Sequence, residues 1–141
     1  MGDKERLFEV SLVREGAYRS ISAALEAVER CVPDETVPVR VLVAPGEYRE
    51  RVEIRRSHVT IEGETADSVR IVGDLGAKMP SGDGSGQDGM LGTFRTYTML
   101  VDADDVTLAN LTIENDAGDG REVGQAIALY ADGDRLVVDA C

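Results

Sequence analysis

Gln125 is the polar residue whose position in this sequence is best suited to chemistry. It follows Gly124 and precedes the apolar run AIALYA, so the turn before a short predicted strand presents a neutral side-chain amide. Such an amide can donate a hydrogen bond to a developing oxyanion, an interaction worth about 2.7–4 kcal/mol when it is well placed. A glutamine that caps a turn or lies in solvent fits the same spacing, and spacing alone favours that simpler role.

Thr93 is the second candidate, because it stands between Gly92 and Phe94, where its hydroxyl could contact a ligand. An ordinary strand threonine explains the same position. His58 is the only histidine, and no serine or cysteine stands at a recognisable spacing from it, so a Ser-His-Asp triad has no support. Asn110 and Asn115 are predicted to stack on equivalent side chains of neighbouring coils, which is a structural role.

The arginines between residues 49 and 56 look at first like an anion-binding patch. Glutamates alternate with them, which predicts a salt-bridged, solvent-exposed face instead. The residues concerned are Arg49, Arg51, Arg55 and Arg56, with Glu47, Glu50 and Glu53. Cys31 and Cys141 lie far apart without a CxxC or Cys/His spacing, so we expect two buried free thiols and no metal site.

The composition restricts the class of partner. The 141 residues carry a net charge of −12, from 27 acidic and 15 basic residues, which makes nucleic acid a poor partner. A polyanionic polymer would be repelled at long range, although salt screens that repulsion, so a neutral or masked acid suits this surface better. No apolar run is long enough to span a membrane. The N-terminal residues lack a secretory signal, which predicts a cytoplasmic protein unless a signal was removed.

The elements that must position these side chains are mostly short strands. One amphipathic helix is predicted from Ser20, as its N-cap, to about Cys31, with Pro33 ending it. Strands are predicted in FEVSLVR, in PVRVLVA up to a break at Pro45-Gly46, and in Arg51–Ile54, HVTIEG and SVRIVG. GTFRTYTMLVD, VTLANLTIEN, AIALYA and RLVVDAC follow, and the glycine-rich stretch 73–92 is predicted to be a loop.

The motif "VT-apolar" recurs in HVTIEG and DVTLANLTIEN, which favours a solenoid whose coils share one continuous core. We therefore predict an all-β, right-handed parallel β-helix, with the helix covering one end and residues 1–141 as a single domain. A β-sandwich is the alternative, and it would require tight antiparallel hairpins.

Several segments, in order, resemble the N-terminal part of pectinesterases (pectin methylesterases). GAYRSISAALEAV is similar to the first turn and helix of that family, and Pro45-Gly46, Tyr48, Glu50 and Val52 match its signature. GTFRTYTMLVDADDVTLANLTIENDAG and GQAIALYADGDRLVVDAC follow in the family's order. The resemblance implies hydrolysis of galacturonate methyl esters in pectin, with release of methanol and without a metal or organic cofactor.

The resemblance also implies roles for individual residues. Gln125 matches the first of the glutamines that polarise the ester carbonyl, and Thr93 matches a substrate-contacting threonine. Cys141 corresponds to a cysteine that precedes the aspartate nucleophile, the acid/base aspartate and the orienting arginine. We therefore expect the 141-residue chain to be a truncated, inactive esterase, and its last coil to expose an unpaired strand edge prone to self-association.

Two other functions fit the residues. A non-enzymatic, polysaccharide-binding β-solenoid would be followed by sequence without a Gln-Asp pair soon after Cys141. Another pectin-active β-helix enzyme, a lyase or polygalacturonase, is the enzymatic alternative. A lyase would need calcium and an electropositive cleft, which the net charge of −12 disfavours.

Overall fold

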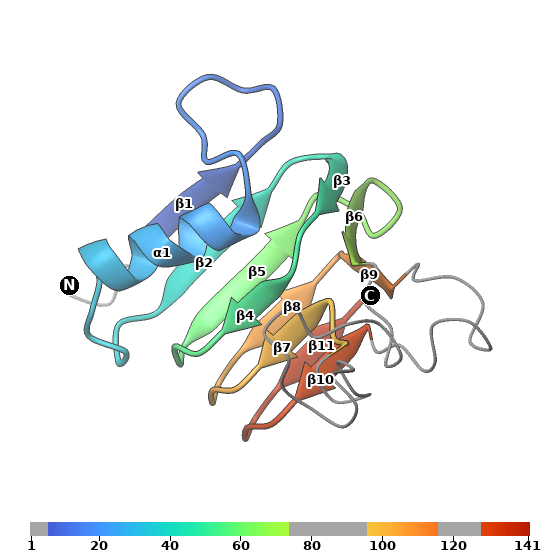
Figure 1. The fold of residues 1–141 in the computed structure, drawn as a ribbon. Helices are drawn as coiled ribbons and strands as arrows, with labels where there is room; N and C mark the ends of the chain where they lie inside the picture. The colour runs from blue at the N-terminus through green and yellow to red at the C-terminus, as the bar shows by residue number, and fades with distance from the viewer. Residues whose placement is uncertain (1–5, 74–95, 116–127) are drawn as a thin grey trace, which may run out of the picture.

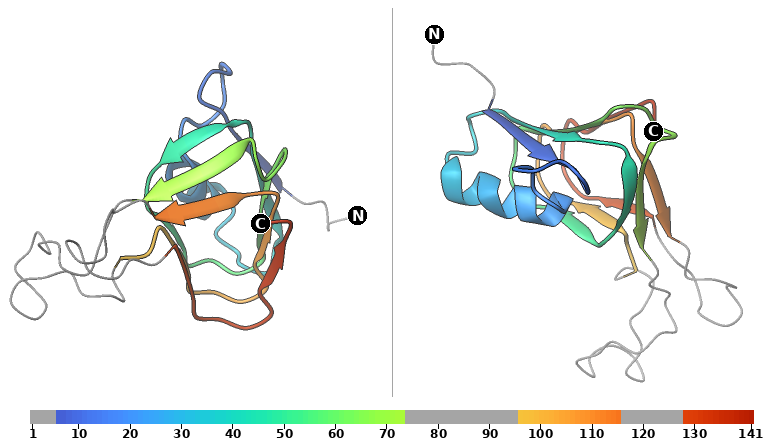
Figure 2. Two further views of the ribbon diagram at one scale, coloured as in Figure 1. Left: turned by 90° about the vertical axis from the view of Figure 1, so that its right-hand side faces the viewer. Right: turned by 90° about the horizontal axis from the view of Figure 1, so that it is seen from above.

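The structure, a computed structural model, describes residues 6–73, 96–115 and 128–141. Within them the chain winds through three parallel sheets, which lie on three sides of the coil (Figure 1; Figure 2, view from above). Sheet A has the strand order β1 (Arg6–Val10), β2 (Val39–Val43), β5 (Val59–Gly63), β8 (Thr107–Ala109) and β11 (Val137–Asp139). Sheet B contains β3 (Gly46–Arg49), β6 (Val69–Gly73) and β9 (Thr112–Asn115). Sheet C contains β4 (Val52–Ile54), β7 (Met99–Val101) and β10 (Leu129–Ala131).

Each turn of the coil contributes one strand to each sheet, as β2, β3 and β4 do in succession. All strand pairings among the described residues are parallel, which excludes the antiparallel hairpins of a β-sandwich. The observed topology is therefore that of a parallel β-helix, as predicted.

The core forms because alternate residues of every strand point into the coil and stack on the same position of the next turn. Val41, Ile61 and Leu108 are paired in register through sheet A, and all three are fully buried. The sequence VRVLV alternates buried and half-buried residues in the same way. Burying one such aliphatic side chain stabilises the fold by about 1.5–3 kcal/mol.

The single helix, α1 (Ile21–Cys31), begins where the sequence predicted. The Ser20 side chain accepts a hydrogen bond from the backbone N–H of Ala23 at 3.0 Å, which is an N-cap. The buried face of α1 contains Ile21, Ala24, Ala27 and Val28, and the helix packs against β1, β2 and β4. It thereby covers the N-terminal end of the core (Figure 1).

Three strand predictions were wrong in detail. The run VTLANLTIEN is two strands, β8 and β9, because Asn110 adopts a left-handed φ of 55° and turns the chain from sheet A into sheet B. Residues 46–49, which begin at the predicted break at Pro45-Gly46 and were assigned to no strand, form β3 because β6 provides a parallel partner. The first strand ends at Val10 and does not extend to Arg14.

The prediction of buried cysteines was also wrong, since Cys31 and Cys141 are both exposed. Cys31 lies in the last turn of α1, where Glu29 and Arg30 are exposed as well. The Cys141 thiol contacts the carbonyl oxygens of Leu108 at 3.5 Å and Asp139 at 3.4 Å.

Candidate active site

Thr93 and Gln125 both lie outside the described residues, so their roles remain predictions. The structure does describe the strand that follows each of them in the sequence, β7 after Thr93 and β10 after Gln125. These two strands are neighbours in sheet C and pair in parallel from Met99 and Leu129 onward. The residues around the start of these two strands therefore form the candidate site.

The ends of β6 and β9 meet the residues that lead into β7 and β10 at one corner of the coil, between sheets B and C. Gly73 and Asn115 end β6 and β9 side by side, in register. The Asn115 side-chain amide donates to the carbonyl oxygen of Thr96 at 2.8 Å. The Thr98 hydroxyl donates to the carbonyl oxygen of Glu114 at 2.7 Å. These bonds link the end of β9 to the residues that lead into β7.

The corner is closely packed, and Thr98 is its centre. A Cβ added to Gly73 would lie 2.3 Å from the Thr98 hydroxyl oxygen, so this approach requires a glycine. The Thr98 N–H donates to the carbonyl oxygen of Ala128 at 3.1 Å, which ties the start of β7 to the start of β10. Thr96 and Thr98 are both buried. The Asn115 amide thus donates to the backbone. Its register partner on β6 is Gly73, so no asparagine stands at the equivalent position of that coil.

Beside this corner, the outer face of sheet C carries a polar and aromatic cluster formed by Arg51, Glu53, Tyr97 and Tyr130. The Arg51 guanidinium lies 3.8 Å from the centroid of the Tyr97 ring, and its Nε donates to the Tyr97 carbonyl oxygen at 3.2 Å. The Tyr97 hydroxyl donates to a carboxylate oxygen of Glu53 at 3.1 Å. The rings of Tyr97 and Tyr130 are 6.4 Å apart and inclined by 60°.

The electrostatics of the cluster keep Glu53 ionised and Tyr97 protonated. Burial acts to raise the pKa of Glu53, but hydrogen bonds from Arg55 and Tyr97, with the charges of Arg55 and Arg51, outweigh it and lower that pKa. Burial, together with the negative charge of Glu53, raises the pKa of Tyr97, although Arg51 opposes this. At neutral pH the phenol is therefore a hydrogen-bond donor to a carboxylate.

Three further carboxyl groups have a lowered pKa, because hydrogen bonds stabilise their charged forms. The donors are Thr36 for Asp34, Arg135 for Asp105 and Arg70 for Glu114. A general acid that works near neutral pH needs the opposite shift. These side chains, like Glu53, are suited to holding charge and not to delivering a proton.

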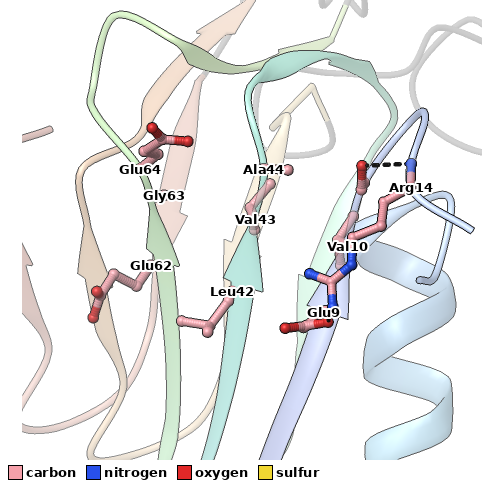
Figure 3. Close-up of a pocket in the computed structure, with 10 residues that line it drawn as sticks. Glu9, Val10, Arg14, Leu42, Val43, Ala44, Glu62, Gly63 and Glu64 are labelled. Carbon is pink, nitrogen blue, oxygen red and sulfur yellow. Dashed lines mark hydrogen bonds and ion pairs between the residues drawn. The ribbon is translucent and has the colours of Figure 1, made fainter. Parts of the chain in front are cut away.

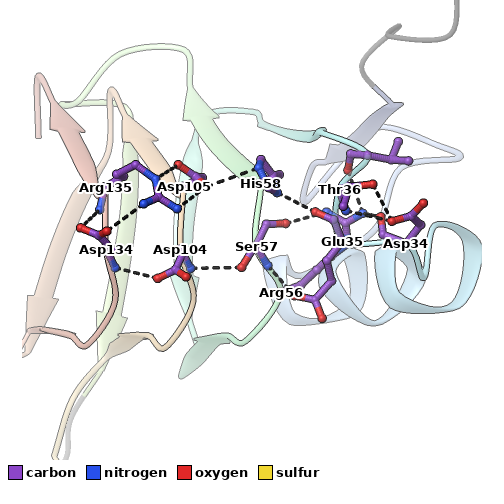
Figure 4. Close-up of polar contacts among 11 residues, drawn as sticks. Asp34, Glu35, Thr36, Arg56, Ser57, His58, Asp104, Asp105, Asp134 and Arg135 are labelled. Carbon is purple, nitrogen blue, oxygen red and sulfur yellow. Dashed lines mark hydrogen bonds and ion pairs between the residues drawn. The ribbon is translucent and has the colours of Figure 1, made fainter.

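Polar side chains of successive turns form a ladder of hydrogen bonds along one edge of the coil (Figure 4). The Glu35 carboxylate accepts from the N–H of Ser57, the Ser57 hydroxyl accepts from the N–H of Asp104, and the Asp104 carboxylate accepts from the N–H of Asp134. Each side chain therefore satisfies a backbone donor of the next coil. Turn chemistry accounts for these residues.

The neighbouring position of the same turns is left-handed in three successive coils, at His58, Asp105 and Arg135, with φ between 55° and 59°. Asp105 pairs with Arg135 and lies 3.4 Å from Nε2 of His58. His58 therefore belongs to a stack of turns.

Within the described ranges, no group of three or more His, Cys, Asp or Glu side chains is placed to hold a metal ion. No helix of these ranges has the length and apolarity to cross a membrane.

The predicted salt-bridged face is confirmed for two arginines and wrong for a third. Arg49 and Arg55 form ion pairs with Glu47 and Glu53 on the surface. Arg56, however, is buried and 4% exposed. Its guanidinium donates only to backbone carbonyl oxygens in the described contacts, which sequence alternation could not reveal.

A separate pocket lies on the outer face of sheet A, away from the sheet C cluster (Figure 3). Leu42 lies between Glu9 and Glu62, its register partners on β1 and β5. Arg14 pairs with Glu9 at its wall. None of the residues at the corner or in the sheet C cluster lines this pocket, so it is not the candidate site.

The comparisons with known proteins decide the family. A family model described as Pectinesterase matches residues 9–141. The chain belongs to the pectinesterase family. It is 31% identical over 134 residues to a pectinesterase of Petunia integrifolia, covering 94% of this chain and 32% of the relative. It is 32% identical to a probable pectinesterase/pectinesterase inhibitor of Arabidopsis thaliana, covering 89% of this chain and 20% of the relative. The chain thus spans a third or less of the length of these relatives.

Solved structures of pectin methylesterases share the fold. One, crystallised in complex with a hexasaccharide, superposes with a TM-score of 0.82 at 24% identity, over 97% of this chain and 42% of that chain. Another, from Yersinia enterocolitica, has a TM-score of 0.72 at 32% identity, over 86% of this chain and 40% of that chain. The predicted all-β, right-handed parallel β-helix with one capping helix is confirmed.

The pectinesterase signature at residues 45–52 has a structural role in this chain. The Tyr48 ring is buried and its hydroxyl donates to the carbonyl oxygen of Ala44 at 2.7 Å. Glu50 accepts from the N–H groups of Ile21 and Ser22, each at 2.9 Å, and so caps α1 from 28 or 29 residues away. Val52 is buried in the core. The Glu50 cap could not be found from local sequence, because the N-cap motif contains only Ser20.

Proposed function

We propose that the protein to which this chain belongs is a pectin methylesterase that hydrolyses galacturonate methyl esters in pectin to pectate and methanol. The observation that carries the proposal is the family match over residues 9–141, together with the β-helix that presents β7 and β10 as neighbours. The substrate we propose is methylesterified homogalacturonan, in which esterification masks the acid that this acidic chain would repel.

In the proposed reaction one aspartate attacks the ester carbonyl while a second, as general acid, protonates the departing methanol. The second aspartate then takes a proton from the water that hydrolyses the acyl-enzyme. We propose that the Gln125 amide stabilises the oxyanion and that Thr93 contacts the substrate. We assign neither aspartate to residues 1–141, because the resemblance to the family places both after Cys141. No metal takes part in the scheme.

The test is methanol release from methylesterified pectin by the full-length protein. We expect Gln125→Ala to lower kcat by about 10²–10³, the usual loss for one oxyanion donor, and Gln87→Ala, a matched change outside the motif, to leave kcat unaltered. Activity should survive a chelator. Full activity of the Gln125→Ala protein would remove this residue from the mechanism, and pectin binding without methanol release would favour the non-enzymatic solenoid.

We further propose that the 141-residue chain alone does not catalyse the reaction. The purified chain should release no methanol under conditions in which the full-length protein does. Methanol release by the purified chain would refute this proposal and would place the reacting carboxylates within residues 1–141. A cytoplasmic location, expected from the N-terminal residues, likewise stays a prediction.

A further inference from the structure

Tyr97 is a nearly buried aromatic residue that contacts side chains on the outer face of sheet C. It contacts Glu53, an exposed side chain on the outer face of sheet C, yet it is itself only 9% exposed. Arg51, from the preceding coil, covers its ring at 3.8 Å, and Tyr130, from the next coil, lies 6.4 Å away. Side chains from three coils therefore meet at this one ring.

The backbone beside Tyr97 is held by the same neighbours. The Arg51 Nε donates to the Tyr97 carbonyl oxygen at 3.2 Å, and the N–H of Val52 donates to the Thr98 carbonyl oxygen at 2.8 Å. The Thr98 N–H in turn donates to Ala128 at 3.1 Å. A displacement of Tyr97 would thus be transmitted to the starts of both β7 and β10.

The guanidinium–ring contact is suited to this task. A planar guanidinium can stack on the ring and still direct Nε to a carbonyl oxygen, whereas a lysine ammonium cannot do both. The contact is partly desolvated, which strengthens a cation–π interaction. The hydrogen bond from the Tyr97 hydroxyl to Glu53 then fixes the other end of the ring.

We propose that Tyr97, clamped by Arg51, is a positioning residue of the ester-hydrolysing site, acting through the backbone at the start of β7 and β10. This inference rests on the proposed function. The pair does not contact the reacting atoms. It sets the geometry of the two strand starts, where misplacement by about 1 Å can cost a hundredfold in rate.

The experiment compares variants of the full-length protein in methanol release and thermal unfolding. Tyr97→Ala should lower kcat by at least about tenfold with KM changed by less than about twofold, because a positioning defect acts on the chemical step. Tyr97→Phe keeps the ring beneath Arg51 and should restore kcat to within about threefold of the wild type. Arg51→Met, which keeps an unbranched chain over the ring, should lower kcat at least about fivefold.

Tyr18→Ala is the matched control. Tyr18 packs against Phe8 at a centroid distance of 6.3 Å, beside β1, and its loss should lower Tm by a similar amount without a change in kcat. If Tyr97→Ala lowers kcat no more than Tyr18→Ala does, the inference is overturned while the proposed function stands. If the wild-type protein releases no methanol, both are overturned. If Tyr97→Ala does not fold, Arg51→Met decides, and an unchanged kcat there overturns the inference.

Discussion

At the scale of single residues, Arg56 shows how a charged side chain can serve as internal scaffolding. Its guanidinium lies beneath the loop between α1 and β2 and donates to the carbonyl oxygens of Val32, Asp34, Val37 and Ser57. Burial lowers the pKa of Arg56, but an arginine remains charged at every pH at which the protein folds. The side chain thus supplies hydrogen bonds that water would otherwise donate to the carbonyl oxygens of a loop without regular secondary structure.

Arg56→Ala should destabilise the protein by about 2–4 kcal/mol, because several buried or partly buried carbonyl oxygens lose their donor at once. The measurement is urea unfolding. Arg55→Ala is the neighbouring control, and the loss of its exposed ion pairs with Glu53 and Asp102 should cost no more than about 1 kcal/mol. Equal effects of the two substitutions would contradict the structural role assigned to Arg56.

Glu50 carries a second prediction at this scale. Glu50→Gln should destabilise the protein by about 1–2 kcal/mol, because the charged acceptor for two N–H groups and the Ser22 hydroxyl becomes a neutral amide. Glu26→Gln, on the exposed face of α1, serves as control and should be nearly neutral. If Glu26→Gln lowered the stability of the protein and Glu50→Gln did not, the capping role of Glu50 would be refuted.

At the scale of elements, one arginine links the three strands of sheet B on their outer face. Arg70 on β6 pairs with Glu47 on β3 at 2.9 Å and with Glu114 on β9 at 2.7 Å. Hydrogen bonds from Arg70, followed by the charges of Arg70 and Arg49, lower the pKa of Glu114, against a smaller opposing effect of burial. The ion pairs therefore run across three successive coils.

This pairing predicts a pH dependence of known sign. Because the pKa of Glu114 is lower in the folded state than its ordinary 4.5, the pair stabilises the fold above that value, and the stabilisation disappears as the pH falls through the folded pKa. The stability difference between wild type and Arg70→Gln should therefore be constant from pH 7 to about 5 and shrink in more acidic buffer. Arg30→Gln, in the last turn of α1, should show no such trend. A gap that widened in acid would contradict the pairing.

At the scale of the whole molecule, sheets A and C end in β11 and β10, which have a strand partner on one side only among the described residues. Val137 and Val138 are 52% and 48% exposed there. An exposed apolar strand edge favours pairing with another chain.

We therefore expect the purified 141-residue chain to associate as its concentration rises, as seen by size-exclusion chromatography or sedimentation. Val138→Lys should weaken this association, because a charge at the edge opposes strand pairing. Val13→Lys, at an 88% exposed position near the other end of the coil, should leave it unchanged. A concentration-independent monomer would count against the prediction.

Much of the fold could be predicted from the sequence, because its determinants are local. The alternation in PVRVLVA and HVTIEG identified strands with one buried face, and Ser20 and Pro33 bounded α1. The order of these segments also identified the family. The candidate residues Thr93 and Gln125 came from that resemblance, and they remain predictions.

Tertiary structure alone decided what depends on stacking one coil upon another. Gly46–Arg49 became a strand because β6 lies beside it, and Arg56 became buried because the loop after α1 folds over it. The cluster at sheet C brings residues 51, 97 and 130 together, although no local pattern connects them. Periodicity specifies which face of a strand is buried, whereas the register between coils, set by the lengths and bends of the turns, specifies which distant side chains become neighbours.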